Sequence, residues 1–449
     1  MRRARRRWDR RLAAALAGTV LTLLAAVLPV QAAKVTRVVS PGGLEAWLVH
    51  EPAIPIVSLE LGFRGGASLD PPGREGLAEM VSGLLDEGAG DLDSQAFQRR
   101  LQELAVRMSF DVGLDTFGGS LETLSENLDD AFDLLRLALT APRFDAEPVE
   151  RVRRQSLASL AQAAEDPDRV ARRTWFRTAF PDHRYGRPVR GTEESVAAIT
   201  AGDLRAFVAR QFTRDKLIVG VVGDVGPERL AGLLDATFGA LPPASAVPEV
   251  SEAAPADSGA LIVVRKPNPQ SVVVFGHAGL KRDDPDFYAA YVMNNILGGG
   301  AFTSRLGKEV REKRGLAYGV YTYLHPLDHA GLFMGGVATE NSRVKESLAI
   351  IRREFARMRD EGVREEELAD AKTFLTGSFP LRLTSNDRIA RMLVGMQLDE
   401  LGIDYLERRN GYIEAVTRED VGRVAARLLS PEALRIVVVG EPEGLATDD

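Results

Sequence analysis

The most constraining feature of the 449-residue sequence is one segment that recurs at a fixed distance along the chain. Residues 198–224 match residues 415–441 without a gap, at an offset of 217. Patterning alone can give two helix–strand units the same apolar positions, but identical polar residues at capping and terminating positions indicate a repeat. Four such pairs are Thr200 and Thr417, Asp203 and Asp420, Arg210 and Arg427, and Gly223 and Gly440. The sequence therefore predicts a duplicated domain, and its length suits two cores of roughly 200 residues each.

The boundary between the two copies is predicted at residues 242–259, which are rich in proline, alanine and serine and have no periodic apolar face. This linker separates an N-terminal domain, residues 33–241, from a C-terminal domain, residues 260–449. Each copy is expected to be α+β, with a mixed sheet packed against helices. In the first copy, apolar periodicity predicts helices over Glu75–Leu85, Ser94–Ala105, Leu124–Leu139, Pro148–Ala164 and Thr192–Phe212, and a buried strand over Lys216–Gly223.

Residues 1–32 have the layout of a secretory signal peptide. Seven arginines lie within the first eleven residues, and an apolar run, Leu12–Val30, precedes small residues. We expect cleavage before Ala33 and a periplasmic mature chain. A retained membrane anchor is the alternative, because the apolar run is near the length that spans a bilayer. The arginine-rich start is compatible with Sec or twin-arginine export.

Charge and cysteine content exclude several classes of partner. The chain has no cysteine, so it has no disulfide, no thiolate metal ligand and no site for a lipoprotein anchor. Loss of residues 1–32 would remove seven arginines and one aspartate, which changes the formal net charge from −7 to −13. Nucleic acid is not expected to bind so acidic a chain.

The stretch 298–323 is the strongest candidate for a functional segment. It begins with three consecutive glycines, which permit close backbone approaches, and passes through a charged helical pattern into strand-type residues. Arg311 and Tyr318 lie seven residues apart across that change and offer a guanidinium with five donors and a phenol. On the residues alone two arrangements are open. The two side chains face one space, or Arg311 forms a surface ion pair with a nearby glutamate and Tyr318 packs in a strand.

Other candidate motifs are weaker. The two histidines of His325–His329 have helical spacing but no evident third metal ligand, and Pro326 predicts a loop there. The remaining histidines, His50, His183 and His277, form no motif. The glycines of the stretch 298–323 open no Walker or dinucleotide fingerprint, so phosphate binding is not expected.

Four segments together carry a resemblance to a known family. They are PPGREGLAEMVSGLLDEG, LSENLDDAFDLLRLAL, RYGRPVRGTEESVAAIT and LGGGAFTSRLGKEVREKRGLAYGVY. On these segments the chain resembles the pitrilysin or insulinase family of zinc metallopeptidases, which includes insulin-degrading enzyme and mitochondrial processing peptidase. The resemblance covers essentially the whole mature chain, and it implies two tandem homologous domains that form half of a clam shell.

The zinc motif of that family is degenerate in this chain. In the family, a helix of the first domain carries His-x-x-Glu-His, and a glutamate from a later helix completes the metal site. The resemblance places Glu79 at the first histidine, Ser82 at the general base and Gly83 at the second histidine. The third ligand falls near Ser159 or Leu160, where no carboxylate stands. Because a catalytic zinc needs three protein ligands, we expect no metal in this chain and interpret Glu79 as a solvated helix residue.

By this resemblance, the arginine and tyrosine that the family carries in its second domain are present in this chain. The resemblance implies that Arg311 and Tyr318 bind substrate by holding the peptide backbone or stabilising the developing oxyanion. It also implies that Gly298, Gly299 and Gly300 border the substrate cleft.

Two functional hypotheses follow from the resemblance. The first is a non-catalytic, substrate-binding subunit of a heterodimeric periplasmic zinc peptidase, with the zinc in a partner chain of the same family. The second is a catalytically inactive peptide-binding or scaffolding protein, like the core subunits of respiratory complexes. Co-purification of a second family chain with peptidase activity discriminates between them.

Overall fold

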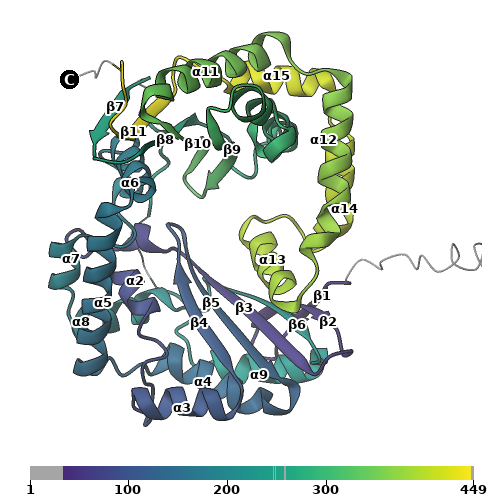
Figure 1. Cartoon of the computed structure of the whole chain (residues 1–449). Helices are drawn as coiled ribbons and strands as arrows, with labels where there is room; N and C mark the ends of the chain where they lie inside the picture. The colour runs from purple at the N-terminus through teal and green to yellow at the C-terminus, as the bar shows by residue number, and fades with distance from the viewer. Residues whose placement is uncertain (1–33, 246, 248, 257–258, 446–449) are drawn as a thin grey trace, which may run out of the picture.

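The computed structural model describes residues 34–445 except 246, 248 and 257–258, and Figure 1 shows the arrangement of the two halves. The predicted signal peptide, residues 1–32, lies outside the described residues. Among the helices of the described part, none is long and apolar enough to cross a membrane.

The first half contains a mixed six-stranded sheet with the spatial order β1-β2-β6-β3-β5-β4. Strands β2 and β6 run parallel, and the other neighbouring pairs run antiparallel. In chain order the strands are β1 (Thr36–Val39), β2 (Glu45–His50), β3 (Ile56–Arg64), β4 (Arg107–Val112), β5 (Thr116–Leu124) and β6 (Leu217–Gly223).

The second half contains a five-stranded sheet with the spatial order β7-β11-β8-β10-β9. Here β7 and β11 are the parallel pair. The strands are β7 (Leu261–Arg265), β8 (Gln270–Ala278), β9 (Ala317–Leu327), β10 (Ala330–Glu340) and β11 (Arg435–Gly440).

The two sheets have the same topology once β1 is set aside. The order β2-β6-β3-β5-β4 corresponds strand by strand to β7-β11-β8-β10-β9, with the same parallel pair. In the repeated segments, Thr200 and Thr417 each accept the backbone N–H three residues on, from Asp203 and Asp420, and each pair forms a capping box. The predicted duplication and the α+β class are confirmed.

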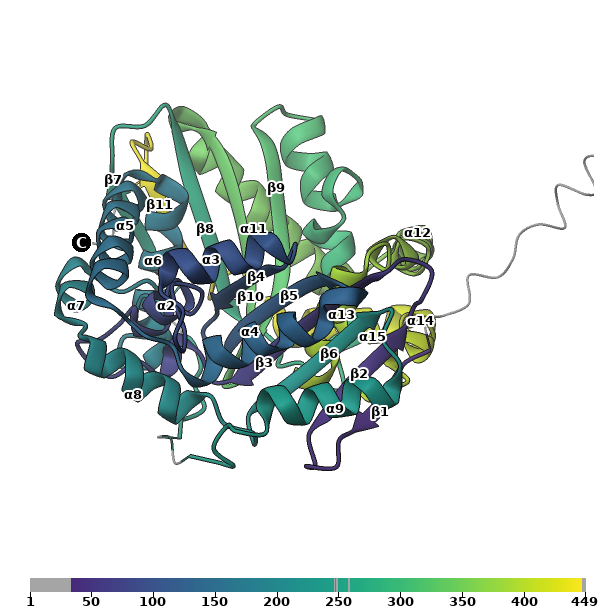
Figure 2. The same ribbon diagram turned by 90° about the horizontal axis from the view of Figure 1, so that it is seen from below.

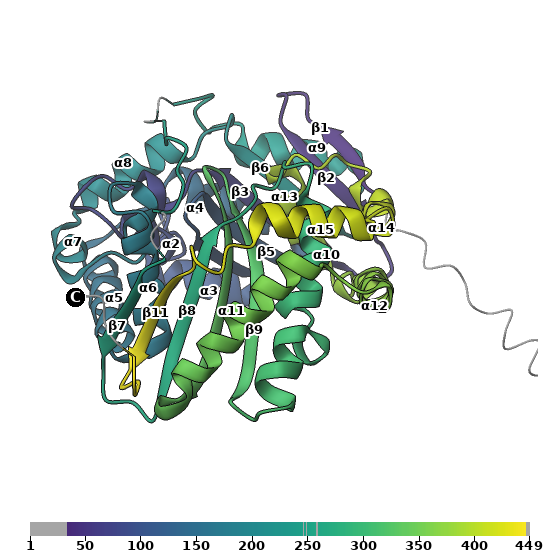
Figure 3. The same ribbon diagram turned by 90° about the horizontal axis from the view of Figure 1, so that it is seen from above.

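Helices cover the outer face of each sheet. Seen from below, α3, α4 and α9 lie across the first sheet, and seen from above, α11 and α15 lie across the second (Figures 2 and 3). The helices of the first half are α2 (Leu77–Ser82), α3 (Ser94–Glu103), α4 (Leu128–Thr140), α5 (Ala146–Glu165), α6 (Pro167–Ala179), α7 (Glu193–Ala198), α8 (Ala201–Gln211) and α9 (Pro227–Phe238). Those of the second half are α10 (Phe287–Asn294), α11 (Val344–Glu361), α12 (Glu365–Gly377), α13 (Asn386–Leu398), α14 (Tyr405–Glu414) and α15 (Arg418–Leu428).

Each half also places one helix on the other half's sheet. Helix α6 of the first half packs on β8 and β11, where the buried indole of Trp175 donates to the carbonyl of Arg435 at 3.2 Å. Helix α13 of the second half packs on β3 and β6, and its Ala390 and Leu393 join a buried cluster with Val222. The two domains are therefore interlocked, although the predicted linker 242–259 separates their strands along the chain (Figure 1).

Several predicted boundaries are wrong. The helix predicted over Thr192–Phe212 is two helices, because Thr200 takes an extended conformation and caps the second. The helix predicted over Glu75–Leu85 begins later, since Gly76 has a left-handed φ of 90°. His325 lies within β9 instead of in a loop.

Candidate functional site

A β-bulge aims Tyr318 away from the core. Ala317 of β9 lies opposite Thr339 of β10, and Val320 lies opposite Val337, so two residues of β9 face one residue of β10. Such a bulge changes the direction in which a side chain points. Tyr318 is 86% exposed, whereas Val320 on the same strand is buried.

Arg311 is held between two exposed aromatic rings. It lies on a π-helical turn, η6 (Gly307–Glu312), and its Cζ is 4.0 Å from the ring centroid of Phe302 and 4.9 Å from that of Tyr318. Phe302 is 63% exposed. Cation–π contacts of this geometry fix a guanidinium without neutralising it. The structure thus brings the predicted Arg311 and Tyr318 together and adds Phe302, which the sequence prediction missed although it lies in the same motif.

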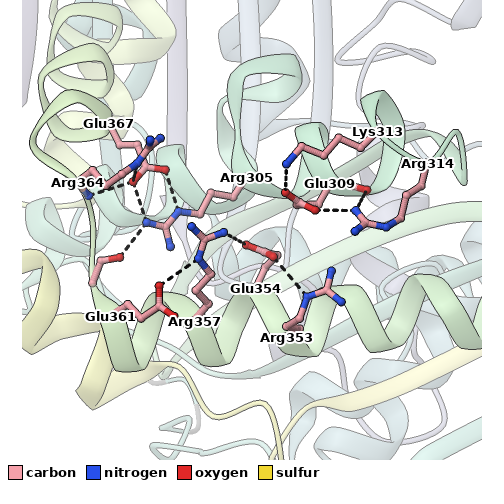
Figure 4. A network of polar contacts seen from close by, with 11 residues as sticks. Arg305, Glu309, Lys313, Arg314, Arg353, Glu354, Arg357, Glu361, Arg364 and Glu367 are labelled. Carbon is pink, nitrogen blue, oxygen red and sulfur yellow. Dashed lines mark hydrogen bonds and ion pairs between the residues drawn. The ribbon is translucent and has the colours of Figure 1, made fainter.

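A carboxylate on the same helical turn, that of Glu309, is paired with other cations. Glu309 accepts hydrogen bonds from Lys313 Nζ and Arg314 Nη1, each at 2.6 Å (Figure 4). The hydrogen bond from Lys313 and, to a smaller extent, the one from Arg314 lower the pKa of Glu309 to about 2. Arg311 forms no ion pair within the described residues. The alternative in which Arg311 pairs with a nearby glutamate is therefore not adopted.

A nearly buried ion pair fixes the start of this segment. Arg305 donates to Glu367 of α12 through Nε at 3.0 Å and Nη2 at 2.8 Å, and Nη2 also donates to the carbonyl of Gly362 (Figure 4). The two side chains are 7% and 12% exposed. This bidentate pair ties the segment that carries Arg311 to α12.

The three glycines allow close packing, Gly298 against β9 and Gly299 and Gly300 against the preceding helical turn. Gly298 and Gly299 lie in a π-helical turn, η4 (Asn295–Gly299), and Gly300 ends it. A Cβ on Gly298 would collide with the hydroxyl of Thr322 and lie 2.8 Å from its backbone nitrogen. Added Cβ atoms on Gly299 and Gly300 would also meet neighbours closer than 3.0 Å. Packing accounts for these glycines, and their contact with substrate stays a prediction.

The degenerate metal positions lie together on α2 and α5, around a guanidinium. Arg190 Nε is 3.5 Å from Glu79 Oε1, and Arg190 Nη1 donates to Ser159 Oγ at 3.4 Å. The Ser82 hydroxyl donates to the carbonyl of Glu79 at 2.8 Å, and Gly83 ends the helix. Burial raises the pKa of Glu79, against the attraction of Arg190. Glu79 is half-buried and ion-paired, so the expectation of a solvated residue was wrong.

This donor set does not suit zinc. It offers one carboxylate, already paired with a cation, and a hydroxyl that donates to the backbone, where zinc needs three ligands. Elsewhere in the described ranges, no three His, Asp or Glu side chains are close enough to hold a metal. No step of metal chemistry is therefore assigned to this chain.

Two further contacts join the first half to β9 and its turn, and neither was predicted from the sequence. Arg172 of α6 donates to the hydroxyls of Tyr321 and Tyr323, both at 2.9 Å. The hydroxyl of Tyr185 donates a hydrogen bond to Asp115 at 2.9 Å and accepts one from the backbone N–H of His329, in the β9–β10 turn. The partners are far apart in the chain, and pairing at that distance leaves no local pattern.

The fold and the site define a two-domain, insulinase-type peptidase fold with an Arg/Tyr pair in its second domain and, among the described residues, no set of three metal ligands in its first. The chain belongs to the peptidase M16 family. The family model described as "Insulinase (Peptidase family M16)" matches residues 46–193, and the one described as "Peptidase M16 inactive domain" matches residues 198–375.

Several known proteins are similar over most of the chain. The "Non-peptidase homolog YmxG" of Helicobacter pylori is 32% identical over 73% of this chain and 76% of its own length. The "Uncharacterized zinc protease SCO5738" of Streptomyces coelicolor is 28% identical over 88% of this chain and 87% of its own. A crystal structure of a peptidase M16 inactive domain from Pseudomonas fluorescens superimposes with a TM-score of 0.85 at 28% identity, covering 92% of this chain and 99% of that one. These matches show that the chain shares the two-domain fold of the family over most of its length.

Proposed function

We propose that this chain is the non-catalytic, substrate-binding subunit of a heterodimeric periplasmic zinc peptidase. It supplies Arg311 and Tyr318 to the active site of a partner chain of the same family, and the partner carries the zinc. The observation that carries the proposal is the exposed stack, in which a guanidinium without an ion-pair partner in the described ranges lies beside a phenol that is 86% exposed.

The stack is suited to binding a peptide and the oxyanion formed during its hydrolysis. A guanidinium and a phenolic hydroxyl donate hydrogen bonds to a carbonyl oxygen, and the bonds strengthen as negative charge develops on that oxygen. The rings of Phe302 and Tyr318 hold Arg311 in place before substrate arrives, which lowers the entropic cost of binding. Because β9 is an edge strand of its sheet, an extended peptide can also lie along it.

The test is co-expression with a family chain that has an intact His-x-x-Glu-His motif, followed by assay of the purified complex. We expect Arg311→Ala to lower peptide hydrolysis by about 100-fold, the usual cost of removing one oxyanion donor. Zinc content should not change, since the metal belongs to the partner. Arg314→Ala is the matched control, because Arg314 is paired with Glu309 and should alter the rate less than twofold.

A catalytically inactive peptide-binding or scaffolding protein is the second candidate. It is favoured by the contacts of Arg172 with Tyr321 and Tyr323, because they tie β9 to the first half and suit a rigid shell. Purification from the native cell decides between the two. If the chain purifies without a second family member and without peptidase activity, the result supports a scaffolding protein.

The periplasmic location is part of the proposal and has its own test. Expression of the full chain with a C-terminal tag, followed by fractionation and N-terminal sequencing, should give a periplasmic protein that begins at Ala33. A protein that keeps residues 1–32 in the membrane fraction contradicts cleavage.

A further inference from the structure

A cavity of about 270 Å³ lies in the second half, between α10, α13 and α14. Aromatic rings form much of its wall, namely those of Phe287, Tyr288, Tyr291, Phe379 and Tyr405. Met392 and Met396 of α13 line another side. Pockets with such walls and a few polar groups are typical of sites for small molecules.

The lining has an excess of positive charge. Among the described residues that line the cavity, Arg282, Arg382 and Arg409 contribute three guanidinium groups, and Asp399 contributes the one carboxylate. Asp399 Oδ2 lies 3.6 Å from Arg282 Nε, so this carboxylate is used by that arginine. Arg382 and Arg409 form no ion pair within the described residues, and Arg409 is only 5% exposed. A buried cation without a counter-charge is costly, and an anion in the cavity would offset that cost.

Arg409 is fixed in place and still has free donors. Its Cζ is 4.2 Å from the ring centroid of Phe379, and its Nη1 donates to the carbonyl of Leu375 at 3.2 Å and to Asn410 Oδ1 at 2.9 Å. Among the described residues, its Nε and Nη2 make no hydrogen bond. Those two atoms form one edge of the guanidinium, the edge that binds a carboxylate through two parallel bonds.

Arg282 is held more tightly and shapes the wall. Its guanidinium lies 4.1 Å from the ring centroid of Phe287 and donates to the hydroxyls of Tyr288 at 3.1 Å and Tyr405 at 3.3 Å. These contacts orient the aromatic rings around the cavity, so that flat apolar surface lies next to positive charge.

We propose that this cavity binds a small organic acid with an aromatic body. The carboxylate pairs with Arg409, Arg382 stands at the exposed mouth, and the ring lies among the aromatic side chains and the methionines of α13. A phosphate fits less well, because its larger hydration shell would be lost against an apolar wall. The proposal concerns a site apart from Arg311 and Tyr318 and does not depend on the peptidase partner.

The cavity also lies at the joint between the two halves. The helix α13, which lines it with Met392, Gly395 and Met396, packs its Ala390 and Leu393 on the first sheet. A bound acid would therefore contact α10 and α14 in the second half and also α13, the helix that packs on the first sheet. We expect binding to raise the melting temperature of the whole chain, because a ligand that binds only the folded state stabilises it.

The first test compares two probes of the same shape, phenylacetate and its neutral amide, phenylacetamide, by calorimetric titration of the mature chain. We expect phenylacetate to bind at least tenfold more tightly, since only the acid pairs with Arg409. Arg382→Gln, an exposed substitution at the mouth, should weaken phenylacetate by several-fold and leave phenylacetamide unchanged. Equal binding of the two probes, or no binding of phenylacetate at millimolar concentrations, overturns the proposal.

The second test fills the cavity without disturbing the fold. Gly395 lies in α13, and a Cβ there would meet nothing within 4 Å, so Gly395→Leu extends a side chain into the cavity. Replacing a helical glycine also favours the helix, so the variant should fold. Gly422→Leu on α15 is the matched control, because a Cβ there also meets nothing within 4 Å. Loss of phenylacetate binding in Gly395→Leu but not in Gly422→Leu supports the proposal, and unchanged binding in Gly395→Leu contradicts it.

Discussion

The ion pair between Arg305 and Glu367 is predicted to stabilise the folded chain. Glu367→Gln keeps the shape of the side chain and removes its charge, which leaves Arg305 nearly buried and without a counter-charge. Breaking a buried pair in this way costs about 3–5 kcal/mol. Burial acts to raise the pKa of Glu367, but the hydrogen bonds from Arg305 and Arg364 outweigh it and lower the pKa to about 2. A displacement of that size from 4.5 corresponds to roughly 3 kcal/mol, which agrees with the first figure.

The lowered pKa fixes the pH dependence of this effect. A carboxylate with a depressed folded-state pKa contributes stability that is present above its unfolded pKa and is lost as the pH falls through its folded pKa. The wild type should therefore be more stable than Glu367→Gln by about 3 kcal/mol at pH 7. That difference should shrink as the pH falls from about 4.5 towards 2.

Tryptophan fluorescence during urea unfolding measures this difference. In a chain that begins at Ala33 and carries Trp47→Phe, Trp175 is the remaining tryptophan, and it packs on the second sheet. Glu361→Gln is the control, since Glu361 belongs to the same network but is 68% exposed and should cost less than about 0.5 kcal/mol (Figure 4). A Glu367→Gln variant as stable as the wild type at pH 7, or a difference that persists in acid, contradicts this prediction.

Three other predictions concern buried residues of the two domains. Burial raises the pKa of Glu60 to about 7, so the wild type should lose about 2 kcal/mol relative to Glu60→Gln as the pH rises from 5 to 8, measured by urea unfolding; a constant difference contradicts this. Gly298→Ala should lower the melting temperature by several degrees because its Cβ collides with β9, whereas Gly319→Ala, which meets nothing within 4 Å, should not; equal melting temperatures would show that the turn relaxes. Tyr185→Phe should speed amide exchange in the β9–β10 turn, because it removes the acceptor for that turn's N–H, and unchanged exchange would show that the contact carries no stability.

The repeat predicted more of the fold than helix and strand periodicity did. Thr200 and Asp203 recur at Thr417 and Asp420 because a helix start must satisfy its free N–H groups, and that requirement is local. The packing of α6 and α13 on the sheet of the opposite domain was not predictable. An amphipathic helix must bury its apolar face, but its sequence does not show which sheet it packs against.

The site shows the same division between local and distant contacts. Arg311 and Tyr318 were found because their motif is contiguous in the chain. The bulge that exposes Tyr318 depends on its pairing with β10, which the residues of β9 do not encode by themselves. Glu79 was misjudged because its partner, Arg190, lies far along the chain.

The most direct test of the proposed role is the turnover of the assembled peptidase with Tyr318→Phe in this chain. The variant keeps the ring that stacks on Arg311 and loses only the hydroxyl, so the complex should assemble with its zinc content unchanged. We predict that kcat for a peptide falls by about 100-fold, as expected for one lost donor to the oxyanion. A complex that hydrolyses the peptide at the wild-type rate contradicts the account.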